Sequence, residues 1–400
     1  MAIKKKKQDQ SVNSEVQDFT DELITTINKE TGNTIAFNLS EDITSTHIKR
    51  WISSGSRQLD YIIANRSGGG FPEGRIVEIS GPPSIGKSHI AAQIVKSAQK
   101  MGGIAVYIDT ENAIQPENLS QLGVNLSRGF VYIDEHCTER VFEIAEKTIL
   151  KARSMQRDVP VVIIWDSVAA TSPKAELEGE YDKDTIGLQA RTISKGMRKI
   201  TGIIGNNNIL FVCLNQIKIK IGVNYGDPTT TPGGNAIPFH ASVRIKLTAG
   251  SPIENKEGEI IGINVNAKTI KNKVARPFRK VSFRILFGKG IDEGEEIFDV
   301  LRAHGPDMVD GHEVSISGDG SWKTLQVSSE TNKDFIVEKF RKADTNKIMN
   351  NPKFKPWIDG LLEKTFTKTS EIEIDAESYQ EAEALQQEIA EETGLDISPE

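Results

Sequence analysis

The sequence predicts an α/β fold in which helices cover both faces of a mostly parallel β-sheet, with a helix before this core and a small α+β module after it. Three observations support this fold class. Nearly continuous apolar runs recur between Arg75 and Leu214, helical stretches separate them, and the segments after Phe239 alternate between apolar and polar residues. Continuous apolar runs are typical of parallel strands buried on both faces, whereas alternation is typical of strands with one solvated face.

The composition of the 400-residue chain excludes several classes of protein. It is 37% hydrophobic and 26% charged, which favours two or three folded domains over disorder. No apolar run approaches the roughly 18 residues of a membrane helix, and the basic N-terminus has no apolar segment behind it, so we expect neither a membrane span nor a secretory signal. The two cysteines, Cys137 and Cys213, lie far apart, which excludes a disulfide scaffold or zinc ribbon and favours the cytoplasm.

Charge is distributed unevenly along the chain. The formal net charge is −7, but residues 371–400 contain eleven acidic residues and no Lys or Arg. The remaining 370 residues carry 49 basic and 45 acidic residues, a balance of +4. A mildly basic body neither requires nor excludes nucleic acid as a partner. The acidic tail is either a solubilising end or a competitor for basic grooves that bind polyanions.

Residues 1–50 precede the core and are expected to contain one helix. Residues 1–15 are polar, and we expect no regular structure there. In 16–28 the apolar side chains fall at helical spacing, at Val16, Phe19, Leu23, Ile24 and Ile27. A lone helix cannot bury such a stripe, so we expect it to dock on its own core or on another molecule. Residues 30–50 are expected to be a linker.

Strands and helices alternate through residues 51–291, which we expect to form the core domain. The strands are expected at 75–80, 104–109, 159–166 and 209–214. The helices are expected at about 90–99, 141–151 and 188–203. Segments 243–247 and 281–287 alternate, which predicts antiparallel or edge strands that close the sheet. Residues 292–370 are expected to form the small α+β domain.

Residues 81–88 match the phosphate-binding P-loop pattern in full. The motif consists of Gly81, Pro82, Pro83, Ser84, Ile85, Gly86, Lys87 and Ser88. Its glycines let backbone N–H groups curl around phosphates, Lys87 reaches the β- and γ-phosphates, and the Ser88 hydroxyl ligates Mg²⁺. An apolar strand precedes the motif and an amphipathic helix follows it, which is the context that the motif requires. The sequence therefore predicts a nucleotide and Mg²⁺ site.

Acidic residues at the ends of neighbouring strands complete this site. Asp166 closes an apolar strand and is expected to orient Mg²⁺ through water. Glu111 is the candidate to polarise the attacking water, since hydrolysis needs a positioned base near the γ-phosphate. Asp109 is an alternative for that role. A purely structural reading also stays open, for Asp109 and Glu111 alike and for Asp166 as a loop cap.

Further motifs follow in one order along about residues 50–291. They read Ser-Val-Ala-Ala-Thr-Ser-Pro-Lys-Ala-Glu-Leu-Glu-Gly-Glu at 167–180, Gly-Leu-Gln-Ala-Arg at 187–191, Gly-Met-Arg at 196–198, Asn-Gln-Ile-Lys-Ile-Lys-Ile-Gly at 215–222, Thr-Thr-Pro-Gly-Gly-Asn-Ala at 230–236 and Lys-Asn-Lys at 271–273. With the P-loop, they closely resemble the bacterial and phage-type RecA DNA recombinase family. The resemblance is much weaker before and after this region.

This resemblance implies a RecA-like P-loop NTPase core and a DNA-dependent ATPase that uses ATP and Mg²⁺. Such a protein polymerises on single-stranded DNA as a homo-oligomeric helical filament. It catalyses homologous pairing and strand exchange with double-stranded DNA in recombination and repair, in the cytoplasm and without a membrane. Gln216 is implied to sense the γ-phosphate, Lys271 and Lys273 to reach the ATP of the adjacent subunit, and Phe287 to lie near the nucleotide. The sequence departs from the family around the base, with Gln115 and Asn118, which leaves the adenine contacts open.

The resemblance also implies two DNA-binding loops, about 178–187 and 217–236, and a helix after the first loop that contacts the DNA backbone. The implied contacts are Ile186, Gly187, Arg191, Ser194, Arg198, Lys218, Ile219, Lys220, Ile221, Gly233, Gly234 and Asn235. The composition of 217–236 is consistent with the second loop, because this long stretch is rich in glycine, threonine and lysine and its apolar residues keep no single helical or strand period over its whole length. Ile186 and Ile221 are suited to wedging between bases, although ordinary core packing is an alternative for both. The basic side chains are alternatively solvated surface charges.

Three classes of protein fit a P-loop core of this kind. One is a filament-forming strand-exchange ATPase, another is a hexameric helicase or related ring ATPase, and the third is a nucleotide-switched regulatory module without a DNA substrate. The long 217–236 loop, its glycine pair with Asn235, and the pair Lys271 and Lys273 favour the first class.

Overall fold

The computed structural model describes residues 2–39, 47–154, 158–180, 187–219, 229–292, 294–328 and 336–372. The chain divides into two compact units, Met1–Ile48 and Lys49–Glu400. Within the described ranges, no helix has the length and apolar content needed to cross a membrane.

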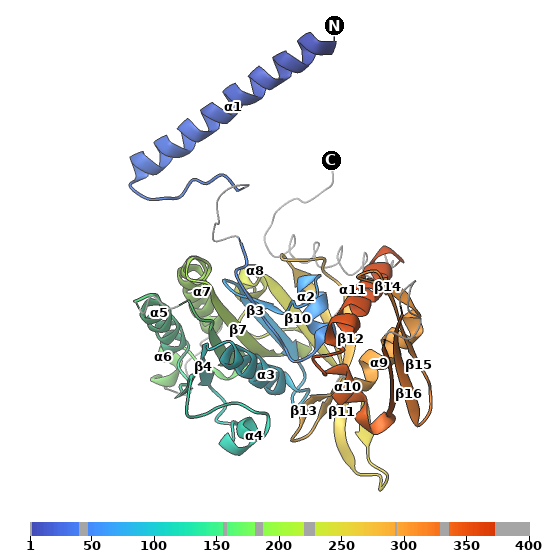
Figure 1. Cartoon of the computed structure of the whole chain (residues 1–400). Helices are drawn as coiled ribbons and strands as arrows, with labels where there is room; N and C mark the ends of the chain where they lie inside the picture. Colours follow the sequence, from blue (N-terminus) through green and yellow to red (C-terminus); the bar gives the residue numbers. More distant parts are fainter. Residues whose placement is uncertain are drawn as a thin grey trace. The chain divides into compact units, whose positions relative to one another are not determined.

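The N-terminal unit contains helix α1, Ala2–Thr31 (Figure 1). The expectation that residues 1–15 lack regular structure is wrong, because the helix already begins at Ala2. This segment has no Gly or Pro, and its Lys, Gln and Glu residues favour helix, so nothing in it stops the helix from extending. Two apolar residues of the predicted stripe, Val16 and Phe19, are 58% and 64% exposed.

The larger unit is built around a nine-stranded sheet. In spatial order its strands are β13 (Gly290–Asp292), β12 (Lys280–Leu286), β11 (Ile260–Asn272), β10 (Val243–Glu254), β3 (Ile76–Gly81), β7 (Ile209–Gln216), β6 (Val161–Asp166), β4 (Ile104–Asp109) and β5 (Phe130–Asp134). From β10 to β5 all neighbours are parallel, and from β10 to β13 all are antiparallel. The predicted parallel sheet with antiparallel closing strands is confirmed.

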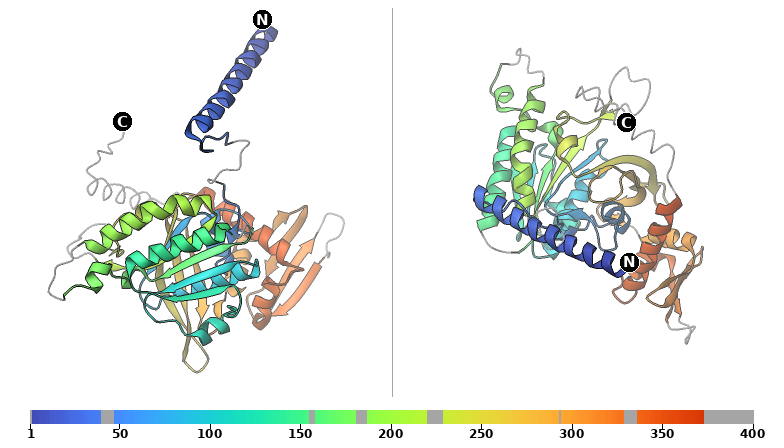
Figure 2. Two further views of the ribbon diagram at one scale, coloured as in Figure 1. Left: turned by 90° about the vertical axis from the view of Figure 1, so that its left-hand side faces the viewer. Right: turned by 90° about the horizontal axis from the view of Figure 1, so that it is seen from above.

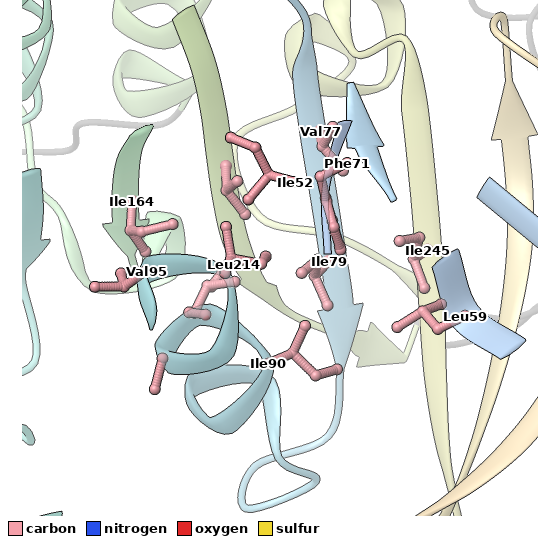
Figure 3. Packing of buried hydrophobic residues seen from close by; sticks show 14 of the residues in the cluster. Ile52, Leu59, Phe71, Val77, Ile79, Ile90, Val95, Ile164, Leu214 and Ile245 are labelled. Atoms are coloured by element: carbon pink, nitrogen blue, oxygen red, sulfur yellow. The ribbon is translucent and has the colours of Figure 1, made fainter. Parts of the chain in front are cut away.

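The helices of this unit cover both faces of the sheet. The three predicted core helices are α3 (Lys87–Lys100), α5 (Thr138–Ser154) and α7 (Leu188–Asn206). Figure 2 shows α5 and α7, in green, side by side across one face, where they bury Trp165. On the other face α3 packs through Ile90 and Val95 against Ile79 and Leu214 of the sheet (Figure 3). Both faces are therefore apolar, as parallel strands require.

Shorter elements connect this framework. They are β1 (Trp51–Ile52), α2 (Arg57–Ala64), β2 (Phe71–Pro72), α4 (Pro116–Gln121), α6 (Lys174–Leu177), β8 (Lys218–Ile219), β9 (Thr229–Thr230), α8 (Ala236–His240) and the 3₁₀ turns Val168–Ala170 and Lys342–Asp344. Helix α2 begins at a capping side chain, because Ser56 Oγ accepts from the backbone N–H of Leu59 at 3.3 Å. It ends at Asn65 in the left-handed region, with φ of 53°.

The C-terminal module has the predicted α+β composition and its own apolar core. It consists of α9 (Gly294–His304), β14 (Asp307–Val309), β15 (His312–Ser317), β16 (Trp322–Ser328), β17 (Ile336–Arg341), α10 (Thr345–Met349) and α11 (Lys355–Ile372), the four strands forming one antiparallel sheet. Helix α11 is fixed to α2 by an ion pair between Arg57 and Asp359 at 3.0 Å. The stacked rings of Tyr61 and Phe366, with centroids 4.4 Å apart, add a second contact.

Candidate active site

The P-loop connects the carboxyl end of β3 to the amino end of α3. Gly86, which caps α3, has φ of 98°, and a Cβ there would lie 2.3 Å from Cδ1 of Ile285 on β12. Only glycine fits this position, on grounds of both backbone conformation and space. Lys87 Nζ donates to the carbonyl oxygens of Gly81 at 2.9 Å and Pro82 at 2.7 Å. Burial lowers the pKa of Lys87, while Asp166 and Glu111 oppose this shift by attraction.

Ser88 and Asp166 form the pair of oxygen donors expected for Mg²⁺. The Ser88 hydroxyl donates to Asp166 Oδ2 at 2.9 Å, which brings the first turn of α3 to the end of β6. Asp166 is 8% exposed, and its burial raises the pKa of this carboxyl above its ordinary value. A hydroxyl and a carboxylate beside a phosphate-binding loop are the hard oxygen ligands that Mg²⁺ prefers, so the residues present fit this ion.

The geometry distinguishes Glu111 from Asp109. Asp109 is buried at the end of β4, and its carboxylate accepts from the backbone N–H groups of Glu111 and Ile114, both at 3.1 Å. It also accepts from the Tyr132 hydroxyl at 3.2 Å. These bonds shape the turn that carries Glu111, whose side chain is exposed. Asp109 is therefore committed to holding the turn, and Glu111 is the acid open to solvent.

Gln216 joins Glu111 to the central strands. It is the last residue of β7 and lies level with Gly81 of β3 in the sheet register. Its Nε2 donates to Glu111 Oε1 at 3.0 Å, and the same oxygen accepts from the Ser167 hydroxyl. The P-loop, Asp166, Glu111 and Gln216 thus meet at the carboxyl edge of four parallel strands, where ligands of open α/β sheets bind.

Phe287 and the segment leading into α4 carry the residues considered for the nucleotide base. Phe287 directly follows β12, the strand whose Ile285 lies close to Gly86 of the P-loop, and is 54% exposed. On the loop leading into α4, Gln115 accepts from Asn118 Nδ2 at 3.4 Å through its side-chain oxygen, and both residues are exposed.

Lys271 and Lys273 lie toward the amino edge of the parallel strands, whereas the P-loop lies at their carboxyl edge. Lys271 is paired with Arg244 of β10, which in turn is level with Glu78, three residues before Gly81. Its Nζ donates to the carbonyl oxygens of Pro238 at 2.5 Å and Phe239 at 2.9 Å, in α8. Burial, together with the nearby charge of Lys273, lowers the pKa of Lys271 to about 8.

Several of the candidate DNA residues lie on α7 or beside its first turns. Gly233 and Gly234 have φ of 95° and 67°, and both lie close to this helix. A Cβ on Gly233 would lie 2.9 Å from Ile193, and a Cβ on Gly234 would lie 2.9 Å from Ala190. On α7 itself Arg191 and Arg198 are exposed, and Arg198 donates to Ser194 Oγ at 2.9 Å. The structure describes further candidates at Gly187, which caps α7, at Asn235, which precedes α8, and at Lys218 and Ile219 in β8.

The second loop is described only at its two ends. There Lys218 pairs with Thr230 and Ile219 with Thr229 in a short antiparallel ribbon. Three of the predicted DNA contacts, Ile186, Lys220 and Ile221, lie outside the described residues.

A buried polar network behind the site is not singled out by the sequence patterns. Glu78, on β3, is fully buried, and its Oε2 accepts from Arg244 Nε at 2.6 Å. Its Oε1 accepts from Asn215 Nδ2 at 3.0 Å, and the same amide donates to the carbonyl of Pro232 at 3.0 Å. The available signal was a charged residue inside an otherwise apolar strand, which must have a partner when buried.

A P-loop joined to a strand-end aspartate, with a mostly parallel sheet behind it, defines the class of P-loop ATPases. Residues 19–292 match the family model for the RecA N-terminal domain. Protein RecA of Pseudomonas savastanoi is 43% identical over 278 residues, which cover 69% of this chain and 73% of that protein. Protein RecA of Bacteroides thetaiotaomicron is 39% identical over 301 residues, covering 75% and 84% of the two chains.

The chain belongs to the RecA family. Its function as a DNA-dependent ATPase of DNA recombination and repair follows from this membership. The alternative function, that of a hexameric helicase or ring ATPase, is not favoured by these relatives. The expected RecA-like core is likewise confirmed over the matched residues.

Proposed function

We propose that this protein, with ATP and Mg²⁺ bound, polymerises on single-stranded DNA as a helical filament and pairs that strand with homologous double-stranded DNA. The observation that carries the proposal is that the P-loop lies at the carboxyl edge of the parallel strands, whereas the lysines at 271 and 273 lie toward the amino edge. Residues 51–291 form the ATPase and DNA-binding core in this proposal, 1–50 the assembly segment, and 292–370 an accessory domain. We place the protein in the cytoplasm with its DNA substrate, where both of its cysteines stay free thiols.

The hydrolytic roles are distributed along the carboxyl edge. The backbone of residues 81–88 and Lys87 bind the phosphates. Ser88 ligates Mg²⁺ and Asp166 orients it through water, and the ion would neutralise phosphate charge when bound. Glu111 orients and polarises the attacking water, and Gln216 reports the γ-phosphate to the loop that follows it. The hydrogen bond between Gln216 and Glu111 supports this coupling, because a ligand that displaces it moves the start of the loop.

DNA binding is assigned to the exposed face of α7 and to the loop from Lys218 to Asn235. Arg191 and Arg198 provide phosphate charge, while Gly233 and Gly234 present backbone without side chains. Contacts of this kind position a DNA strand without reading its base sequence. Homologous pairing requires such contacts, because base pairing between the DNA strands supplies the specificity.

Lys271 and Lys273 act in trans in this proposal. They lie toward the amino edge of the sheet, whereas the P-loop lies at the carboxyl edge, so they serve the ATP of an adjacent subunit. A cation delivered in this way stabilises charge on the transferred phosphoryl group, as an arginine finger does, with effects of about 10³–10⁵ in rate. Turnover then depends on DNA, because DNA aligns the subunits.

The test compares Lys271→Ala with Lys87→Ala in nucleotide binding and in DNA-stimulated ATP hydrolysis. We expect Lys271→Ala to lower the stimulated rate by about 10³-fold or more and to leave nucleotide affinity nearly unchanged. Lys87→Ala should damage both. Lys256→Ala, which removes an exposed lysine from the turn after β10, is the matched control and should change neither. Normal DNA-stimulated turnover by Lys271→Ala contradicts the trans assignment.

Electron microscopy with an ATP analogue and single-stranded DNA tests assembly separately. Helical filaments support the proposal. Closed rings point to a ring ATPase, and the absence of any assembly points to a nucleotide-switched module.

A further inference from the structure

The candidate metal aspartate has a second hydrogen-bond donor that the family motifs do not include. The Tyr107 hydroxyl donates to Asp166 Oδ2 at 2.6 Å, the same oxygen that accepts from Ser88. Tyr107 lies in β4, directly beside β6, where its backbone is level with Ile164. The side chain is fully buried, so this bond forms in the interior of the protein and not at its solvent surface.

Because the Tyr107 hydroxyl is buried, its hydrogen bond to Asp166 Oδ2 is not exchanged for one to water. Asp166 is itself 8% exposed, and its Oδ2 accepts from both Tyr107 and Ser88. The two donors therefore offset part of the free energy that an ionised carboxylate loses away from water.

We propose that Tyr107 is a positioning residue for Mg²⁺, holding the Asp166 carboxylate in one orientation against Ser88. This inference rests on the proposed function, specifically on Ser88 and Asp166 as the Mg²⁺ site. Two donors on Oδ2 restrict rotation of the Asp166 carboxylate. Without the Tyr107 hydroxyl, this oxygen would accept from the Ser88 hydroxyl alone. Partners that orient metal ligands in this way typically contribute about 10–100-fold to metal affinity.

The phenol ring has a separate packing role, which the test must leave intact. Tyr107 packs near Phe130 of β5, with ring centroids 6.4 Å apart. Tyr107→Phe keeps the ring and removes only the hydroxyl, so its effect isolates the bond to Asp166. The matched control is Tyr61→Phe, which removes the hydroxyl of another buried tyrosine, in α2 and outside the site, and keeps its ring.

The experiment titrates Mg²⁺ into the full-length protein with a fluorescent ATP analogue and follows equilibrium binding without turnover. In Tyr107→Phe we expect the half-saturating Mg²⁺ concentration to rise about tenfold or more, with nucleotide affinity in the absence of Mg²⁺ unchanged. In Tyr61→Phe both quantities should stay at the wild-type values. An unchanged Mg²⁺ dependence in Tyr107→Phe overturns the inference, as does an equal shift in both variants.

Asp166→Asn separates this inference from the site on which it rests. If this variant loses the Mg²⁺ dependence while Tyr107→Phe retains it, the proposed site stands and the role of Tyr107 is overturned. If Asp166→Asn keeps the wild-type Mg²⁺ dependence, the proposed Mg²⁺ site itself is wrong, and the inference is overturned with it.

Discussion

Single buried polar residues hold together the strands that carry the site. The carboxylate of Glu78 on β3 binds Arg244 of β10 and Asn215 of β7, one on each side. Asn215 then binds the carbonyl of Pro232, just before the glycine pair that approaches α7. One side chain thus fixes the two strands that flank β3 and, through Asn215, the end of the candidate DNA loop.

We expect Glu78→Gln to lower the free energy of unfolding by about 3 kcal/mol, because it leaves the Arg244 guanidinium buried without its counter-charge. Urea unfolding followed by circular dichroism measures this change. Glu254→Gln, at the exposed end of β10, is the control and should lie within about 0.5 kcal/mol of the wild type. A loss for Glu78→Gln as small as the control's contradicts a structural role for the ion pair.

The lowered pKa of Lys271 predicts a pH dependence of stability. The folded protein releases this proton above about pH 8, whereas an unfolded lysine keeps it until about pH 10.4. Between these values the unfolded state binds more protons, so the contribution of Lys271 to stability rises with pH. Lys271→Met lacks this contribution, and its stability relative to the wild type should fall from pH 7.5 to pH 9.5 in urea unfolding without DNA. Parallel pH profiles contradict the prediction.

At the scale of elements, apolar patterns in the sequence predicted most of the core helices and strands. The strands β3, β4, β6 and β7 are continuous apolar runs, the helices α3, α5 and α7 have a helical period, and the P-loop is a contiguous motif, so all were visible in the sequence. The strands β5 and β11 were not predicted: β5 is a half-exposed edge strand of only five residues, and β11 mixes apolar and polar residues along its thirteen positions. Both form because a neighbouring strand supplies their hydrogen bonds.

Long-range bonds in the site were invisible for a related reason. Tyr107 and Asp166 are 59 positions apart, and Glu78 and Arg244 are 166 apart. Their contact depends on the order of strands in the sheet, which no local period encodes.

Helix α1 is the element for which we predict a role in assembly. Its residues belong to a unit separate from the core, and Phe19 and Leu23 of its apolar stripe are largely exposed. Deleting residues 1–30 should therefore leave a folded, monomeric protein that binds ATP, as judged by circular dichroism, analytical ultracentrifugation and nucleotide titration. Aggregation or unfolding of the shortened protein would show instead that its own core needs the stripe.

At the scale of the whole molecule, the two edges of the sheet explain why we propose that the ATP site is completed by a second subunit. The P-loop edge carries the acids and the phosphate-binding backbone, and the lysine pair lies toward the other edge. A surface that must meet a different surface of the next copy makes a head-to-tail contact, and such contacts propagate into rings or helices. The proposed filament is the helical outcome of this asymmetry.

The charge of the whole chain yields the last prediction, which concerns residues 371–400. Their eleven acidic residues accompany a body with a balance of +4, and we predict that they compete with duplex DNA for basic surface on that body. Removing them should tighten duplex binding and steepen its salt dependence, because more protein cations become free to displace counterions from DNA. The difference should shrink above about 0.1 M salt, where the screening length falls to about 10 Å.

Fluorescence anisotropy with labelled DNA across a salt series measures both effects of this truncation. Single-stranded DNA is the internal control. We propose that it binds elsewhere, at Arg191, Arg198 and the loop from Lys218 to Asn235, so its affinity should change less. If the full-length and truncated proteins bind duplex DNA with equal affinity and equal salt slope, the tail only keeps the protein in solution. A tail that acts by charge must instead lose its effect in proportion to screening, because the attraction between its carboxylates and the basic surface has no other physical source.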